Sequence, residues 1–216
     1  MAAQKNALFE IPQQYLSDFP ESLITSVSYR GKVFAVPFYL TSAITFANFD
    51  LMQKADIKTI PATYDEMFSY AEQIRTKTNA FVEMPTVNEN DTFLKILNKY
   101  NIGIFDNIAN EDSQKIFKMY EYLYRNNLIP KESVTQGHRE ALEKYMAGQI
   151  VFLQAGANFL NIVKENASTV YQNTVLSKQM TGSVGNYDFS LMNLIIPQKA
   201  KNKEINEIIL ATNATT

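Results

Sequence analysis

The sequence predicts an α/β fold, because short β-rich segments alternate with amphipathic helices along its 216 residues. Hydrophobic residues make up 46% of the chain and charged residues 19%, which supplies the apolar material for a packed core and argues against wholesale disorder. The sequence contains no cysteine. Disulfides, thiolate metal sites and a cysteine nucleophile are therefore excluded.

The first elements are a hairpin and a long strand. Two β-rich runs flank Arg30-Gly31, a pair that favours a tight turn. Pro37 interrupts the pattern, and the β-branched and aromatic residues 41–47 predict a further strand. We expect residues 45–48 to belong to a strand within a mixed sheet that has helices on its faces.

A capping box marks the first clear helix. Thr63 and Glu66 have the spacing at which each side chain satisfies a backbone N–H at a helix start, and the apolar positions continue through Ile74. The later elements follow from the same periodicity and stop residues. We expect strands at residues 81–84, 150–153 and 189–196, and helices from about residue 92 to Gly103, from Asp112 to before Pro130, over 138–147 with Gly148 behind it, over 157–165, and from Lys203 onward.

Charge and hydropathy exclude two classes of protein. The formal net charge is −2 and the basic residues are scattered, whereas nucleic-acid binding needs a basic stripe that displaces counterions. The longest uncharged stretches fall short of the ~20 apolar residues of a membrane-spanning helix. The start of the chain has no apolar segment typical of a signal peptide.

No catalytic or metal-binding constellation is visible. The single histidine, His138, lies at a predicted helix start, where a capping or surface role is typical. The polar loop from Asn88 to Asp91 resembles a calcium loop superficially, but Phe93 and Lys99 occupy the positions at which an EF-hand needs Gly and Glu. We therefore interpret this loop as one that ends in a helix cap at Asp91. No catalytic residue, metal or cofactor is expected.

A binding surface has more support. The chain has 12 Tyr and 14 Phe, and several of them stand beside polar residues in predicted loops. Aromatic faces together with amide and carboxylate groups suit neutral polyols, because C–H surfaces stack on rings while hydroxyl groups need donors and acceptors. Each ring taken singly is also compatible with an ordinary core position.

Six segments between residues 29 and 204 are informative in combination. They are YRGKVFAVPFY (29–39), TFANFDL (45–51), IPATYDE (60–66), YRNNLIP (124–130), YMAGQIVFLQAG (145–156) and IPQKAKNKE (196–204). In this order they resemble the bacterial extracellular solute-binding proteins of ABC importers, family 1, sugar-binding type. Sugar binders of the family place Trp near the positions of Asn158 and Tyr187, and this chain contains no Trp.

The resemblance implies a periplasmic-binding-protein-like fold of type II, with mostly one lobe and its interlobe crossing strands. Residues 1–48 would form an N-terminal segment with the crossing strands, 49–196 the second lobe, and 197–216 the start of a C-terminal helical part. Much of the N-terminal lobe and the closing helices of the family would lie outside this sequence. The protein would be a monomer that acts outside the cytoplasmic membrane, in the periplasm or as an anchored lipoprotein, and that delivers a small solute to ABC permease subunits.

The family also implies where a ligand binds, namely at the interlobe strand, at loops following strands and at the turn after Gly156. The hypothesis is that a sugar or oligosaccharide binds there. The corresponding candidate residues are Tyr39, Thr41, Asn88, Asp91, Asn158, Tyr187 and Asp188. Two alternatives stay open, an enzyme on the same two-lobed scaffold and a non-transport receptor or degenerate fragment. Ligand-induced stabilisation without turnover would separate the transport hypothesis from both.

Overall fold

The computed structural model describes residues 2–89, 92–102 and 109–202, which divide into two compact units. Unit 1 comprises Met1–Thr41 and Phe189–Thr216, and unit 2 comprises Ser42–Asp188. These bounds differ from the three segments expected from the sequence. The difference arises because β3 (Val36–Thr41) pairs with β7 (Ser190–Leu194), which joins two distant segments within unit 1.

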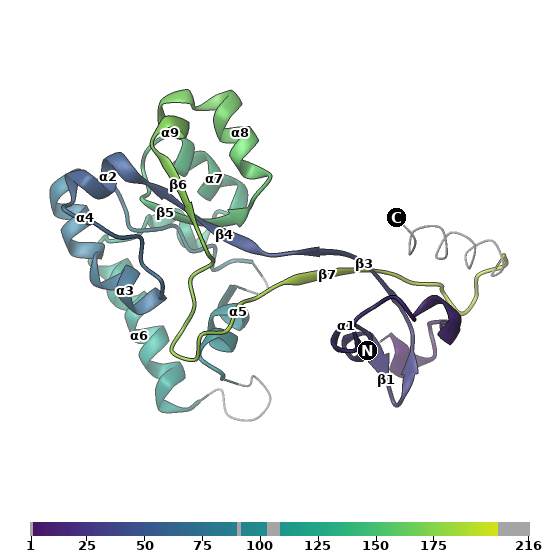
Figure 1. Ribbon diagram of the computed structural model, residues 1–216. Helices are drawn as coiled ribbons and strands as arrows, with labels where there is room; N and C mark the ends of the chain where they lie inside the picture. Colours follow the sequence, from purple (N-terminus) through teal and green to yellow (C-terminus); the bar gives the residue numbers. More distant parts are fainter. Residues whose placement is uncertain (1, 90–91, 103–108, 203–216) are drawn as a thin grey trace. The chain divides into compact units, whose positions relative to one another are not determined.

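Unit 2 is built on a three-stranded sheet whose central strand is β4 (Ala43–Asn48). It lies between β5 (Phe152–Gly156) and β6 (Thr174–Ser177), and both pairings are antiparallel (Figure 1). In the described part of the chain, parallel pairing is limited to two isolated bridges, Phe81 with Ile150 and Thr63 with Thr181. The parallel share of the expected mixed sheet is therefore small.

Helices cover both faces of this sheet. Neighbouring residues of a strand point to opposite sides, so each strand contributes side chains to two separate cores. Ala47 and Phe152 pack with one group of helices, and Phe46 and Leu153 with another. The first group is α2 (Phe49–Lys54), α3 (Tyr64–Ser69), α4 (Ala71–Thr78), α5 (Thr92–Lys99) and α6 (Glu111–Arg125). The second is α7 (His138–Met146), α8 (Phe159–Asn166) and α9 (Ser168–Gln172), and a short 3₁₀ turn, η3 (Lys131–Val134), precedes α7. The expected α/β class is confirmed.

Local sequence features explain most helix boundaries. The hydroxyl of Thr63 accepts a hydrogen bond from the backbone N–H of Glu66 at 3.1 Å, so the predicted N-cap is confirmed. The Glu66 carboxylate accepts from the N–H of Ala62 rather than of Thr63. The predicted helix through Ile74 is divided at Tyr70 into α3 and α4. α9 and β6 were not expected from the sequence.

Two predicted strands differ in their extent. Residues 81–84 form an extended segment with a single bridge at Phe81 rather than a strand, and β5 begins at Phe152 rather than at residue 150. The predicted strand over 189–196 is confirmed as β7. The expected helix end at Gly103 and the expected helix from Lys203 onward lie outside the described residues.

In its described residues, unit 1 has a small core and little regular structure. Its elements are η1 (Ala3–Lys5), η2 (Gln13–Tyr15), α1 (Glu21–Ser26), β1 (Ser28–Tyr29) and β2 (Lys32–Val33), with β3 and β7. The predicted hairpin is confirmed, and its turn residues Arg30 and Gly31 have φ angles of 52° and 75°. Two consecutive positive φ angles are those of a type I′ turn, which matches the twist of the paired strands.

The β3–β7 pair is a two-stranded ribbon with an exposed apolar surface. Pro37 lies within β3 rather than interrupting it, next to a shift in register. A proline fits there because a strand with a single partner leaves backbone N–H groups unpaired. Apolar side chains of the ribbon and its flanks are more than half exposed. They are Phe38, Tyr39, Leu40, Phe189, Met192 and Ile195.

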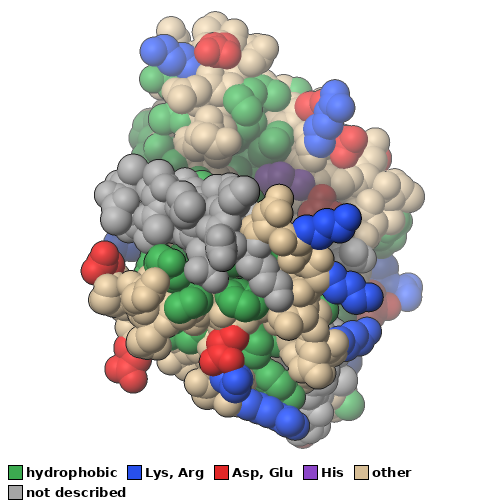
Figure 2. Space-filling model, turned by 90° about the vertical axis from the view of Figure 1, so that its right-hand side faces the viewer, with side chains coloured by type: hydrophobic (Ala, Val, Ile, Leu, Met, Phe, Trp, Pro, Cys, Tyr) green, Lys and Arg blue, Asp and Glu red, His purple; other side chains and the backbone are tan. Residues whose placement is uncertain are grey.

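The molecular surface carries charges of both signs. Acidic, basic and apolar side chains all occur on the face shown in Figure 2. Within residues 2–89, 92–102 and 109–202, no helix is long and apolar enough to cross a membrane.

Candidate functional site

One edge of the unit 2 sheet, at the first residue of β4, brings together Asn158, Tyr187 and Asp188. The first residue of β4 pairs there with Gly156, the last residue of β5. The bridge between Phe81 and Ile150 is parallel, so the segment that leads to Asn88 starts in the same direction as β5. Asn88 and Asn158 therefore both follow segments that run towards this edge.

Asn158 lies exposed, directly before α8. Its side chain caps no backbone N–H of that helix, so its amide is available to a ligand, whereas the N–H groups of Leu160 and Asn161 donate to the carbonyls of Ala157 and Asn158. A Cβ atom on Gly156 would lie 2.7 Å from the Asn158 Oδ1 atom. The glycine therefore permits the position of this amide, and a larger residue would displace it.

Asn88 is also exposed, but its loop is attached to the start of α7. The Asn88 amide donates to the carbonyl of Thr135 at 3.3 Å. The next residue, Glu89, accepts from the backbone N–H of His138 at 2.5 Å. The loop thus supplies a cap, as its polar composition indicated, although the helix is α7. Asp91, with the cap expected there, lies outside the described residues.

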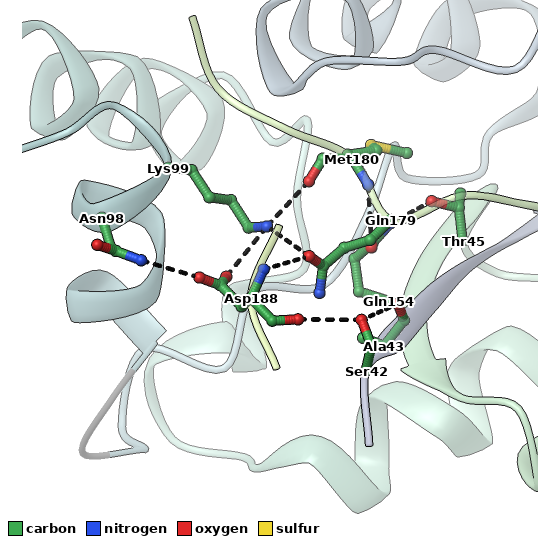
Figure 3. A network of polar contacts seen from close by, with 9 residues as sticks. All are labelled: Ser42, Ala43, Thr45, Asn98, Lys99, Gln154, Gln179, Met180 and Asp188. Carbon is green, nitrogen blue, oxygen red and sulfur yellow. Dashed lines mark hydrogen bonds and ion pairs between the residues drawn. The ribbon is translucent and has the colours of Figure 1, made fainter. Parts of the chain in front are cut away.

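Tyr187 and Asp188 lie at the same edge, at the end of unit 2. The Tyr187 side chain is 52% exposed. The Asp188 carboxylate accepts from the Asn98 amide at 3.1 Å and forms an ion pair with Lys99 at 3.0 Å (Figure 3). The Asp188 carbonyl accepts from the Ser42 hydroxyl at 3.0 Å, which connects it to the residue before β4. The described contacts of Asp188 are thus internal, and its expected ligand contact stays a prediction.

Lys99 is a buried cation that sequence reasoning missed. Its residue exposure is 2%, and its ammonium lies 3.0 Å from each of three acceptors, on Gln179, Met180 and Asp188. Burial lowers the pKa of Lys99, while the hydrogen bond and charge of Asp188 act in the opposite direction. The signal in the sequence was its spacing, because a residue three places after Ile96 falls on the buried face of an amphipathic helix.

The same network continues into the sheet (Figure 3). The Gln154 amide donates to the Thr45 hydroxyl at 2.7 Å, and that hydroxyl donates to the carbonyl of Lys178 at 2.7 Å. Gln154 also accepts from the N–H of Met180 at 3.4 Å. Paired side chains of β4 and β5 therefore hold the start of the segment that carries Tyr187.

This segment passes very close to the end of α5. A Cβ atom on Gly182 would lie 2.5 Å from the Lys99 carbonyl oxygen, so only glycine fits there without a backbone shift. Gly185 has a φ of 72° in the following turn. Close packing thus explains the glycine at position 182, and turn geometry explains the one at position 185.

The two remaining candidates belong to unit 1. Tyr39 lies in β3 opposite Met192 and is 53% exposed, and Thr41 lies opposite Ser190 and is half-buried. The structure brings Asn158, Tyr187 and Asp188 to the edge of unit 2 and places Tyr39 and Thr41 on the ribbon of unit 1. Their shared role in ligand binding stays a prediction.

A second titratable group, the half-buried Glu83, lies near the core of unit 2. Burial raises the pKa of the Glu83 carboxyl to about 7, although a hydrogen bond from the Tyr120 hydroxyl at 3.3 Å acts to lower it. Burial, and then the neighbouring Glu83 charge, raises the pKa of Tyr120 well above its usual value. An acidic residue between two apolar ones, Val82 and Met84, was the available signal.

A groove of about 980 Å³ lies elsewhere on unit 2, along α3 and α6. Its lining includes the apolar side chains of Phe68, Ile116 and Met119, with Tyr122 and Glu72 also present. Its described lining contains none of the six predicted binding residues that the structure describes, so we place the candidate site at the sheet edge.

Almost the whole chain matches one protein family. Residues 1–207 match the family described as bacterial extracellular solute-binding proteins. The chain belongs to this family. The resemblance stated from six short segments is therefore confirmed.

Solved structures of solute-binding proteins share the fold. A candidate oligosaccharide periplasmic-binding protein from Synechococcus sp. MITs9220 has a TM-score of 0.89 and 28% identity, covering 100% of this chain and 56% of that one. The galacto-N-biose-/lacto-N-biose I-binding protein of the ABC transporter from Bifidobacterium longum has a TM-score of 0.78 at 16% identity, covering 100% of this chain and 57% of its own. The periplasmic-binding-protein-like fold is confirmed.

Among curated proteins, the arabinooligosaccharide-binding protein of Bacillus subtilis is 29% identical over 114 residues, which are 49% of this chain and 25% of that protein. The matched segment therefore spans a quarter of the length of this relative, and the whole chain spans about half the length of the Synechococcus protein. The three relatives named above are described as binding proteins.

Proposed function

We propose that this chain is part of the substrate-binding component of an ABC importer and that it contributes the sheet edge of unit 2 to a sugar-binding site. The observation that carries the proposal is the convergence of Asn158, Tyr187 and Asp188 on this edge. An amide and an exposed ring are groups that bind carbohydrate hydroxyl groups and C–H faces. The family and the oligosaccharide-binding relatives favour the same ligand class.

The electrostatics of the edge favour a neutral ligand. The Asp188 carboxylate is paired with the Lys99 ammonium, so the two buried charges compensate each other. A charged ligand would need an unpaired opposite charge, since burying an uncompensated ion is costly. A neutral sugar or oligosaccharide needs only the donors, acceptors and ring that this edge offers.

Titration with a panel of neutral sugars tests the proposal. Saturation-transfer difference NMR and calorimetry would be applied with maltotriose, arabinotriose, lacto-N-biose and mannitol as probes. We expect one class to bind and to be weakened by Tyr187→Ala and by Asn158→Ala. Phe117→Ala, an exposed ring on α6, and Asn161→Ala, one turn further along α8, are the matched controls. Binding that neither site variant weakens would place the site elsewhere.

The same samples separate transport from catalysis. We propose that the sugar is released unchanged, because the protein acts as a carrier that delivers its ligand to permease subunits. NMR spectra of the sugar after prolonged incubation should be identical to those at the start. Any new sugar signal that grows with protein concentration would support the alternative of an enzyme on this scaffold.

We also propose that the protein acts outside the cytoplasmic membrane as a monomer. The family, whose members are extracellular solute-binding proteins, supports this location. Fractionation of the native cells with an antibody against the chain would test it. Recovery of the protein only in the cytoplasmic fraction would contradict the proposal.

A further inference from the structure

We propose that Lys99 is a positioning residue for the ligand, which acts through Asp188 to hold the Tyr187 ring at the sheet edge. This inference rests on the proposed function, because it concerns the same site. It assigns a role to a buried cation that does not itself reach the ligand.

The geometry at Lys99 is that of a fixed anchor. An ammonium has three donors, and the three acceptors at 3.0 Å, on Gln179, Met180 and Asp188, all belong to the segment before β7. Gln179 also accepts from the backbone N–H of Asp188 at 2.7 Å. One side chain of α5 therefore binds both ends of the segment that carries Tyr187.

The backbone N–H, the backbone carbonyl and the side-chain carboxylate of Asp188 all have partners within the protein. Its N–H is bound by Gln179, its carbonyl by Ser42 and its carboxylate by Asn98 and Lys99 (Figure 3). Tyr187 precedes it directly. Because the backbone after Tyr187 is fixed while its ring is half exposed, the anchor defines where the ring is presented.

A purely stabilising role would not require this chemistry. Replacing a buried ion pair by apolar residues of similar volume is often neutral or stabilising. The pair gives instead a directional contact, since each ammonium donor has one acceptor at a defined place. We therefore infer that the ion pair serves the orientation of the segment rather than the stability of the core.

The absence of Trp from the chain permits a direct test. Tyr187→Trp places a single tryptophan at the site, and its fluorescence anisotropy and its quenching by acrylamide report how firmly this position is held. In that background, Lys99→Met should lower the anisotropy and increase the quenching. In the unlabelled protein, Lys99→Met should raise the Kd of the sugar identified above by about tenfold, the effect of one lost charge-assisted hydrogen bond.

Matched variants distinguish positioning from stability. The Asn110 side chain caps α6 by accepting a hydrogen bond from the Ser113 N–H at 2.7 Å. Asn110→Ala removes this cap and should destabilise unit 2 without changing the tryptophan signals. Asn98→Ala removes one contact of the Asp188 carboxylate from an exposed position and should give a smaller change in the same direction as Lys99→Met. It also serves as the test if Lys99→Met fails to fold.

Two results would overturn the inference. The first is a Lys99→Met variant, or an Asn98→Ala variant in its place, with unchanged anisotropy and quenching. The second is an unchanged Kd for the sugar despite altered fluorescence. If no sugar binds the unmodified protein, the proposed function fails, while the fluorescence still shows whether Lys99 holds Tyr187.

Discussion

The β3–β7 ribbon and the three-stranded sheet of unit 2 use similar strands in opposite ways. β4 lies at the centre of a sheet covered by helices on both faces, and Phe46 and Ala47 are completely buried. β3 precedes β4 in the chain and is separated from it by one residue. It pairs with a single strand, and its residues Phe38 and Leu40 are more than half exposed. Adjacent strands of equal length thus differ in burial because their partners differ. Apolar composition alone does not show which of them carries the core.

The largest expected effect lies in the buried sheet. Phe46→Ala should lower the free energy of unfolding by about 3–5 kcal/mol, because it removes a ring that packs edge-on against Phe159 and Tyr145 and leaves a cavity. Urea unfolding followed by circular dichroism would measure the change. A loss below about 1 kcal/mol would mean that the core of unit 2 can rearrange around the missing ring.

The free energy of unfolding of unit 2 should also depend on pH. The folded state holds the pKa of Glu83 at about 7, above its ordinary value of 4.5, so folding favours the neutral carboxyl. This contribution to stability is complete below pH 4.5 and is lost as the pH rises through about 7. The expected loss is about 3 kcal/mol, since each unit of difference in pKa between the folded and unfolded states contributes about 1.4 kcal/mol.

Urea unfolding between pH 4 and pH 8 would reveal this loss, and Glu83→Gln should remove it. A profile that is the same in the protein and in the Glu83→Gln variant would contradict the assignment to this residue.

A smaller effect is expected at the start of α3. Thr63→Ala should cost about 0.5–2 kcal/mol, because the N–H of Glu66 loses its acceptor. Chemical denaturation is the measurement. Thr63→Ser keeps the hydroxyl and should recover most of the loss, and an unchanged midpoint in the alanine variant would show that this cap contributes no stability.

The smallest effect is expected on the exposed ribbon. Met192→Ser should change the free energy of unfolding by less than about 0.5 kcal/mol, because the side chain is 60% exposed. The same denaturation experiment applies. A loss comparable to that of Phe46→Ala would show that another surface covers the ribbon in solution, and the contrast between the two sheets would disappear.

Local signals predicted the boundaries that depend on neighbouring residues. The Arg30-Gly31 turn, the Thr63 cap and the Gly148 helix end all follow from interactions within a few residues. The predicted division into segments differed from the two units because β3 and β7 are joined by a pairing across some 150 positions, which no local pattern reveals.

The candidate site shows the same limit. The exposed polar residues Asn158 and Tyr187 could be selected from the sequence, because they stand in loops beside glycine and aromatic residues. The internal contacts of Asp188 could not, since its partners Lys99 and Ser42 are distant in the chain. The burial of Lys99 could not be predicted from its residue type, because charged side chains are typical of the surface.

The hydrogen bond between Ser42 and Asp188 has a consequence for the order of folding. It joins the first and last residues of unit 2, so the completed unit presents the starts of both connections to β3 and β7 next to each other. The chain between Ser42 and Asp188 is then already ordered, so the pairing of β3 with β7 does not have to include the entropic cost of closing it. Unit 2 should fold first, and the β3–β7 ribbon should form afterwards, between two segments whose starts are already close together. Pulsed hydrogen exchange should protect the amides of β4 before those of β3, and the reverse order would contradict this sequence of events.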